Sequence, residues 1–230
     1  MAATAQQPEP RDTIIDAALE LAAGGRWSEV TLSDIAEEAK VPLRTVYEEL
    51  GSRSAILAAF FRRIDAEVLG EEEGFDQEEA ARDRLFDVLM RRFEALQPHR
   101  AAVSSIYADC LCQPTSGLGS LPQLNRSMAW MLTAAGISAE GWSGLVRVQG
   151  LSALWIATMR VWLRDESDDM GKTMAALDRN LRRAEGLLER MSSRRRYRRR
   201  HAPEEREEDR GPAPGAAPGQ APEPPSGAPA

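Results

Sequence analysis

Residues 31–50 constrain the fold most, because they combine two short helical segments with a tight turn. Thr31 with an aspartate three residues later is typical of the capped start of a helix. The small Ala39 lets two helices approach closely, and Val41 and Val46 have the spacing of residues that fill the turn and the core. This arrangement predicts a helix-turn-helix, whose second helix enters the major groove of DNA. An ordinary three-helix bundle without a nucleic-acid role has the same spacing.

The rest of the chain shows helical periodicity and no strand pattern, so the sequence predicts an all-α fold. We expect a first helix that ends at Gly24-Gly25, a long helix that Ser52 caps, a loop over 114–119, and further helices over 32–39, 42–50, 77–96, 99–112, 122–136, 139–163 and 168–190. The expected organisation is a disordered N-terminus (1–9), a three-helix domain with the helix-turn-helix (10–70), a larger helical bundle (71–193) and a disordered basic, acidic and Pro/Ala/Gly-rich tail (194–230).

The segment TLSDIAEEAKVPLRTVYEELGSRSAIL, residues 31–57, resembles the helix-turn-helix of the TetR family of transcriptional regulators. The matching positions are Thr31, Asp34, Ile35, Ala36, Ala39, Val41, Thr45, Tyr47, Ser52 and Leu57. The resemblance implies a homodimeric regulator, most simply a repressor, that binds double-stranded DNA. It also implies that a small apolar ligand, bound in the larger helical domain, modulates the DNA binding.

The resemblance further implies roles for single residues. Thr45 and Tyr47 donate hydrogen bonds to phosphate oxygens, and Arg53, where the family has lysine, meets the DNA backbone. Lys40 and Arg44 are the long cations of the recognition segment. Arg44 is the candidate for a base edge, most simply guanine. The alternative for Arg44 is a solvated charge that makes no base contact.

Departures from the family pattern bear on how strongly DNA is bound. Lys40 replaces the turn glycine, which predicts a left-handed backbone at a non-glycine residue. Pro42 replaces the usual serine, and Glu48 and Glu49 put two carboxylates near the expected path of the phosphates. The chain has 29 basic and 36 acidic residues, a formal net charge of −7, whereas faces that bind nucleic acid are usually basic. The acidic balance argues against strong DNA binding but not against the fold.

Residues 145–163 are the most apolar part of the chain, and their apolar side chains surround the expected helix. In a TetR-like regulator the last two long helices form a two-fold dimer interface, which would bury such a helix. The expected dimer contacts are Leu151, Trp155, Met159 and Trp162, unless these fill the core of a single chain. The expected ligand contacts, unless they are plain core, are Phe93, Tyr107, Met128, Trp130, Met131 and Trp142.

A second resemblance concerns the segment after this apolar helix. Asp165, Ser167, Asp169, Thr173 and the pair Leu177-Asp178 resemble the C-terminal segment of the ubiquinone-biosynthesis lipid-binding proteins. Those proteins are TetR-like in fold but bind isoprenoid lipid instead of DNA. The alternative function is therefore that of a lipid-binding accessory protein without DNA binding.

The sequence offers no residues that predict catalysis, a cofactor or a metal site. His99 and His201 cannot form a plausible paired-histidine site, and Cys110 and Cys112 have the spacing of neither a redox pair nor a zinc site. No apolar run approaches the length of a membrane span, and the N-terminus does not resemble a signal peptide. We therefore expect a soluble, cytoplasmic protein that is not an enzyme.

The expected tail begins with a strongly basic block. Arg194–Arg200 place six arginines in seven residues, shortly before an acidic run over 204–209. Basic blocks of this kind are typical of nucleic-acid-binding arms. We expect the block to add non-specific DNA affinity, unless it is a solvated tail with no role.

Overall fold

The computed structural model describes residues 9–70, 79–112 and 114–200, and it describes their side chains outside 111–120 and 188–200. Within these ranges the regular elements are helices and no strand occurs, which confirms the predicted all-α fold. The elements are α1 (Pro10–Gly24), η1 (Trp27–Glu29), α2 (Leu32–Glu38), α3 (Leu43–Glu49), α4 (Arg53–Gly70), α5 (Ala81–Leu96), η2 (Gln97–His99), α6 (Arg100–Cys112), α7 (Pro114–Ala134), α8 (Gly141–Trp162) and α9 (Gly171–Arg200). The chain divides into two units, Met1–Leu188 and Glu189–Ala230.

Some helix boundaries differ from those expected. α7 begins at Pro114 and runs through Pro122, so the loop expected over 114–119 is helical. α7 packs against α4, α5, α6 and α8, and this tertiary packing outweighs the weak helix propensity of its glycines and prolines. α9 continues to Arg200, beyond its expected end at 190, because arginine is a good helix former. Residues 194–200, expected to begin the disordered tail, continue α9 instead, whereas the expected disorder at 1–8 and 201–230 lies outside the described residues.

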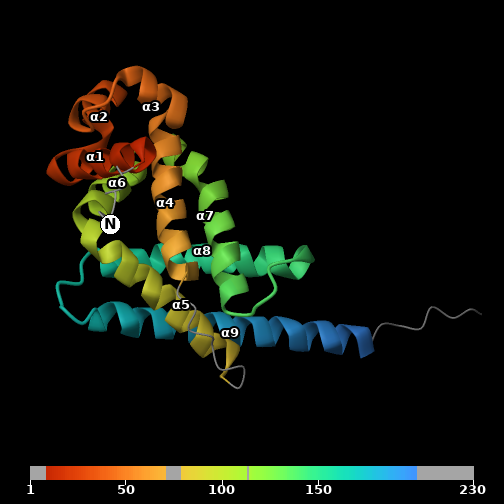
Figure 1. The fold of residues 1–230 in the computed structure, drawn as a ribbon. Helices are drawn as coiled ribbons and strands as arrows, with labels where there is room; N and C mark the ends of the chain where they lie inside the picture. The colour runs from red at the N-terminus through yellow and green to blue at the C-terminus, as the bar shows by residue number, and fades with distance from the viewer. Residues whose placement is uncertain (1–8, 71–78, 113, 201–230) are drawn as a thin grey trace, which may run out of the picture. The chain divides into compact units, whose positions relative to one another are not determined.

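The helix-turn-helix consists of α2 and α3, with α1 packed against both (Figure 1). The Thr31 hydroxyl accepts a hydrogen bond from the backbone N–H of Asp34 at 3.2 Å, and the Asp34 carboxylate accepts one from the Thr31 N–H at 2.8 Å. This is the predicted capping box, and the hydrogen bonds from Thr31 lower the pKa of Asp34. The core of the motif is formed by the buried Ile35, Ala36, Ala39 and Val46, as predicted.

Two left-handed residues bracket α3. Lys40 has a φ of 55°, which confirms the conformation predicted for the position where the family has glycine. This conformation lets Val41 donate its backbone N–H to the Ala36 carbonyl at 3.0 Å. Gly51, with a φ of 67°, follows α3, and the Ser52 hydroxyl then accepts a hydrogen bond from the first turn of α4. The two turns set the orientation of α3 relative to α2 and α4.

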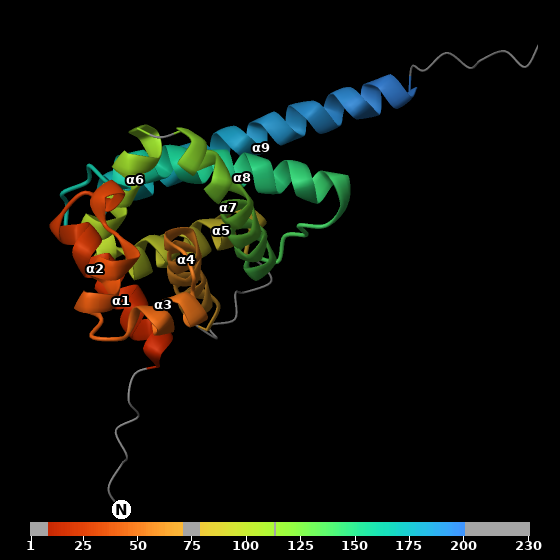
Figure 2. The same cartoon turned by 90° about the horizontal axis from the view of Figure 1, so that it is seen from above.

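α4 joins the helix-turn-helix to the larger bundle. Figures 1 and 2 show α4 running from the end of α3 alongside α7, and it packs against both α5 and α7. α1 also packs against α6. The helix-turn-helix therefore meets the bundle along α4 and along α6, and both belong to the unit that ends at Leu188.

A buried ion pair ties α4 to the bundle core. Arg92 of α5 and Asp65 of α4 lie 3.1 Å apart (Nη2 to Oδ1) and are 1% and 6% exposed. The Ser127 hydroxyl of α7 donates to Asp65 at 2.7 Å and accepts from Arg92 at 2.5 Å. The guanidinium lies over the Trp155 ring, 4.8 Å from its centroid. Burial lowers the pKa of Arg92, and the charge of Asp65 offsets part of this shift. Three helices thus meet at one charged contact.

A buried carboxylate fixes the turn between α8 and α9. Asp165 accepts hydrogen bonds from the Thr173 N–H (2.8 Å) and hydroxyl (2.7 Å), and from the Ser167 N–H (3.2 Å) and hydroxyl. Burial by itself would raise the pKa of Asp165, but the hydrogen bonds from Ser167 and Thr173 outweigh it and hold the pKa well below its usual range. These residues, which carry the second resemblance, therefore have a structural role in this chain.

Replacing Asp165 by alanine is expected to lower the free energy of unfolding by about 1.5–3 kcal/mol, the usual worth of a hydrogen bond to a charged group. The folded pKa lies below the unfolded value of about 3.9, so the stabilisation is complete above that pH and is lost as the pH falls through the folded pKa. Urea unfolding should therefore show a smaller difference between wild type and Asp165→Ala near about pH 3 than at neutral pH. An equal difference at both pH values would contradict this assignment.

Candidate DNA-binding interface

α3 presents a polar face to solvent on the side opposite the buried Val46. Arg44 is exposed, Tyr47 is 75% exposed, and Lys40 is exposed in the turn that precedes the helix. Thr45 is half-buried beside them. The turn and α3 thus carry all the expected DNA contacts except Arg53.

Arg44 has a carboxylate as its neighbour. Its Nε donates a hydrogen bond to Glu48 Oε1 at 2.7 Å. The two residues lie one helical turn apart and form an ion pair on the exposed side of α3. An exposed helical pair of this kind is worth about 0.3–0.5 kcal/mol. A guanine edge that accepts two hydrogen bonds from the guanidinium is worth more, so it can replace the pair. Glu48 therefore competes with DNA for Arg44, and the exposed Glu49 adds a second negative charge nearby.

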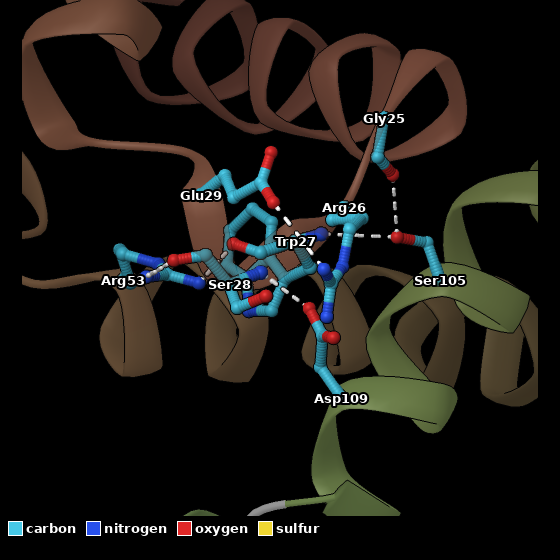
Figure 3. A network of polar contacts seen from close by, with 8 residues as sticks. All are labelled: Gly25, Arg26, Trp27, Ser28, Glu29, Arg53, Ser105 and Asp109. Atoms are coloured by element: carbon cyan, nitrogen blue, oxygen red, sulfur yellow. Dashed lines mark hydrogen bonds and ion pairs between the residues drawn. The ribbon is translucent and has the colours of Figure 1, made fainter.

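Arg53, expected to contact the DNA backbone, points inward in this structure. Its guanidinium lies over the Trp27 ring, 4.5 Å from the centroid. It donates to the Ser28 carbonyl at 3.3 Å and also to the Trp27 carbonyl, as Figure 3 shows. The carbonyls of a short helix lack partners within the helix, and a guanidinium has enough donors to satisfy several of them. Arg53 therefore fastens η1 to the start of α4.

Two side chains of α6 fasten the same connector from the other side (Figure 3). The Ser105 hydroxyl accepts from the Trp27 N–H at 3.1 Å and donates to the Gly25 carbonyl at 2.7 Å. The Asp109 carboxylate accepts a hydrogen bond from the Ser28 N–H. The connector between α1 and α2 is thus held between α4 and α6. Sequence reasoning missed these contacts, because their partners lie far apart along the chain and no local pattern signals them.

The expected ligand contacts do not gather at one place. Phe93, Met128 and Met131 are buried core residues. Tyr107 is half-buried and accepts a hydrogen bond from Arg160 at 2.9 Å. The two tryptophans of the set are exposed to solvent, Trp130 on α7 and Trp142 at the start of α8. The set therefore combines core residues with surface residues, and the tryptophans do not line a site inside the bundle.

The four side chains expected at a dimer interface are buried within the single chain. They are Leu151, Trp155, Met159 and Trp162. The Trp155 ring stacks on Phe93 with a centroid distance of 4.3 Å, and the Trp162 indole N–H donates to Gln97 Oε1 at 2.9 Å. This burial favours the alternative that these side chains fill the core of a single chain. The exposed face of α8 carries Trp142, Val146, Ala153 and Ala157 instead.

Among the described residues, no helix combines the length and the apolar character that a membrane crossing requires. The same residues contain no cluster of histidine, cysteine, aspartate and glutamate side chains that could hold a metal ion.

A capped helix-turn-helix with an exposed second helix, joined to further helices, is an arrangement found in DNA-binding proteins. Residues 14–60 match the family model described as bacterial regulatory proteins, tetR family. The HTH-type transcriptional regulator AlkX of Mycobacterium tuberculosis is 37% identical over 54 residues, 24% of this chain and 26% of that regulator. This chain thus matches only a minor part of that regulator's length.

Similarity to solved structures covers much more of the chain. A TetR transcriptional regulator from Nitrosomonas europaea has a TM-score of 0.61 and 27% sequence identity over 76% of this chain and 97% of that one. A TetR regulator from a Rhodococcus species has a TM-score of 0.58 and 21% sequence identity, and the match covers 76% of this chain and 96% of that one. At this identity the likeness shows the fold alone. Residues 14–60 thus match the TetR family model, and the described helices have the fold of solved TetR regulators.

Proposed function

We propose that this protein is a homodimeric repressor that binds a pseudo-palindromic operator through α3 and releases it when a small apolar ligand binds. The outward face of α3 carries the proposal, because Arg44, Tyr47 and Lys40 are exposed on a rigid, capped motif. A two-fold dimer places two such helices in successive major grooves, about 34–36 Å apart. Binding at a promoter blocks transcription, and such a protein acts in the cytoplasm, where the DNA lies.

The outward face of α8 supports the dimer. Trp142, Val146, Ala153 and Ala157 are exposed and follow one another at intervals of four and seven residues along the helix. This spacing puts them on one side of α8, and the two alanines allow a second helix to approach closely. We infer that α8 of a second copy packs against this face. The tryptophan at its end provides the large apolar contact area that interface anchors usually supply.

The connection between α4 and the bundle supports ligand control. α4 begins directly after the helix-turn-helix, and further along it carries Asp65, which contacts Arg92 and Ser127. An apolar ligand that enters the core beside Phe93 would separate the helices that hold Asp65. α4 would then shift, and the two recognition helices of a dimer would no longer match successive grooves.

The isoprenoid-binding alternative is not favoured. The comparisons lead to transcriptional regulators. The face of α3 also retains the exposed residues that DNA binding needs, which a lipid-binding protein does not require.

Two substitutions on α3 should change DNA affinity in opposite directions. Arg44→Ala is expected to weaken binding to a selected operator by about 1–3 kcal/mol and to relax specificity at one position. Glu48→Gln should strengthen binding several-fold, because it frees Arg44 and removes a charge that repels phosphates. Fluorescence anisotropy with labelled duplexes at several salt concentrations measures both effects. Arg62→Ala, which removes an exposed arginine of α4, is the matched control. Equal affinities for wild type and Arg44→Ala would contradict the assignment of the site.

A further inference from the structure

The first turn of α3 contains an exposed apolar residue that sequence reasoning passed over. Leu43 is the first residue of α3 and is 50% exposed. It borders a surface hollow of about 550 Å³ whose lining is Leu32, Ser33, Leu43, Arg44 and Tyr47. The hollow is continuous with the DNA-binding face, because Arg44 and Tyr47 belong to both. Leu43 and Tyr47 are one helical turn apart, which is the signal in the sequence that could have revealed this surface.

In the major groove, only one group on the base edges can make a favourable apolar contact with a leucine at this position. The first residues of a recognition helix contact base edges. Those edges present hydrogen-bond donors and acceptors, and only thymine adds an apolar group, its C5 methyl. A leucine against a donor or acceptor would bury that group without a partner, which costs free energy. Contact with a methyl group removes apolar surface from water on both sides.

We propose that Leu43 determines operator specificity by packing against the C5 methyl of a thymine, in the same half-site as the base contacted by Arg44. Leu32 and Tyr47, which line the same hollow, flank this contact. The inference rests on the proposed function, because it requires α3 to enter the major groove. It adds an apolar contact to the hydrogen bonds of Arg44, so the half-site contains a thymine whose methyl group contributes to affinity.

Deletion of single methyl groups from the DNA tests the proposal. A high-affinity duplex is first selected from a random library with the wild-type protein. Each thymine of one half-site is then replaced in turn by deoxyuridine, which removes the C5 methyl and leaves base pairing unchanged. For wild type, one of these single replacements should raise the Kd about fourfold, which corresponds to the free energy of burying one methyl group. In Leu43→Ala that replacement should have no effect. Leu69→Ala, which shortens an exposed leucine of α4, should retain the wild-type response.

The outcomes separate the inference from the proposed function. If no duplex is selected or bound, the proposed function fails, and the inference fails with it. If DNA is bound but no thymine is sensitive to loss of its methyl, the inference alone is overturned. The same holds if Leu43→Ala keeps the full sensitivity of wild type, because another residue then contacts the methyl.

Discussion

Replacing Asp65 by alanine is expected to lower the free energy of unfolding by about 3–5 kcal/mol, because it leaves the Arg92 guanidinium charged, buried and without its counter-ion. Asp65 also accepts a hydrogen bond from the Ser127 hydroxyl, so the substitution removes polar contacts of α4 with both α5 and α7. Urea unfolding followed by circular dichroism measures the loss. Because α4 follows directly after the helix-turn-helix, operator affinity should fall at the same time.

Two further variants test whether the loss comes from the buried charge. Asp16→Ala removes an exposed carboxylate that lies 2.7 Å from Arg63, and such an exposed pair is worth about 0.2–1 kcal/mol. The double variant Asp65→Leu with Arg92→Met removes both buried charges and should recover most of the lost stability. The account of the ion pair is wrong if Asp65→Ala costs no more than Asp16→Ala.

Ala153→Arg should convert the proposed dimer into monomers and reduce operator affinity by about 100-fold or more, because a monomer loses the second half-site. Ala153 lies in the middle of the exposed face of α8, so a two-fold contact would bring two arginines together in a desolvated interface. The substitution is at an exposed position and should leave the fold of the single chain intact. Sedimentation or light scattering and operator titration measure the two effects.

The matched control for this substitution is Ala66→Arg, which adds the same side chain at an exposed position of α4. That variant should remain dimeric and bind DNA as wild type does. Persistence of the dimer in Ala153→Arg at micromolar concentration would place the interface on another face of the chain.

The local features of the helix-turn-helix could be predicted from the sequence because they depend on residues close together in the chain. The capping box of Thr31 and Asp34 and the left-handed Lys40 are set by neighbours within a few residues. The burial of Val46 follows from helical spacing. The resemblance to the TetR helix-turn-helix implied Arg44 and Tyr47 as DNA contacts, and both are exposed on α3.

The contacts that depend on distant segments could not be predicted in this way. Arg53 matches a family position for backbone contact, but Trp27 and the carbonyls beside it draw the guanidinium inward. Trp155 and Trp162 lie on a helix that is apolar on several sides, and the sequence does not say which side faces another chain. In the structure the side of α8 with both tryptophans packs inside the bundle, and the side with Ala153 is exposed to solvent. Tertiary packing determines which side is buried.

We propose above all that two copies of α3 bind one operator with two-fold symmetry. The most direct test is to select DNA from a random library and to footprint the bound duplex. The account predicts a pseudo-palindrome whose half-sites are protected about 34–36 Å apart, one turn of the double helix, with protection lost in Ala153→Arg. Failure to enrich any sequence, or a protected site without two-fold symmetry, would contradict it.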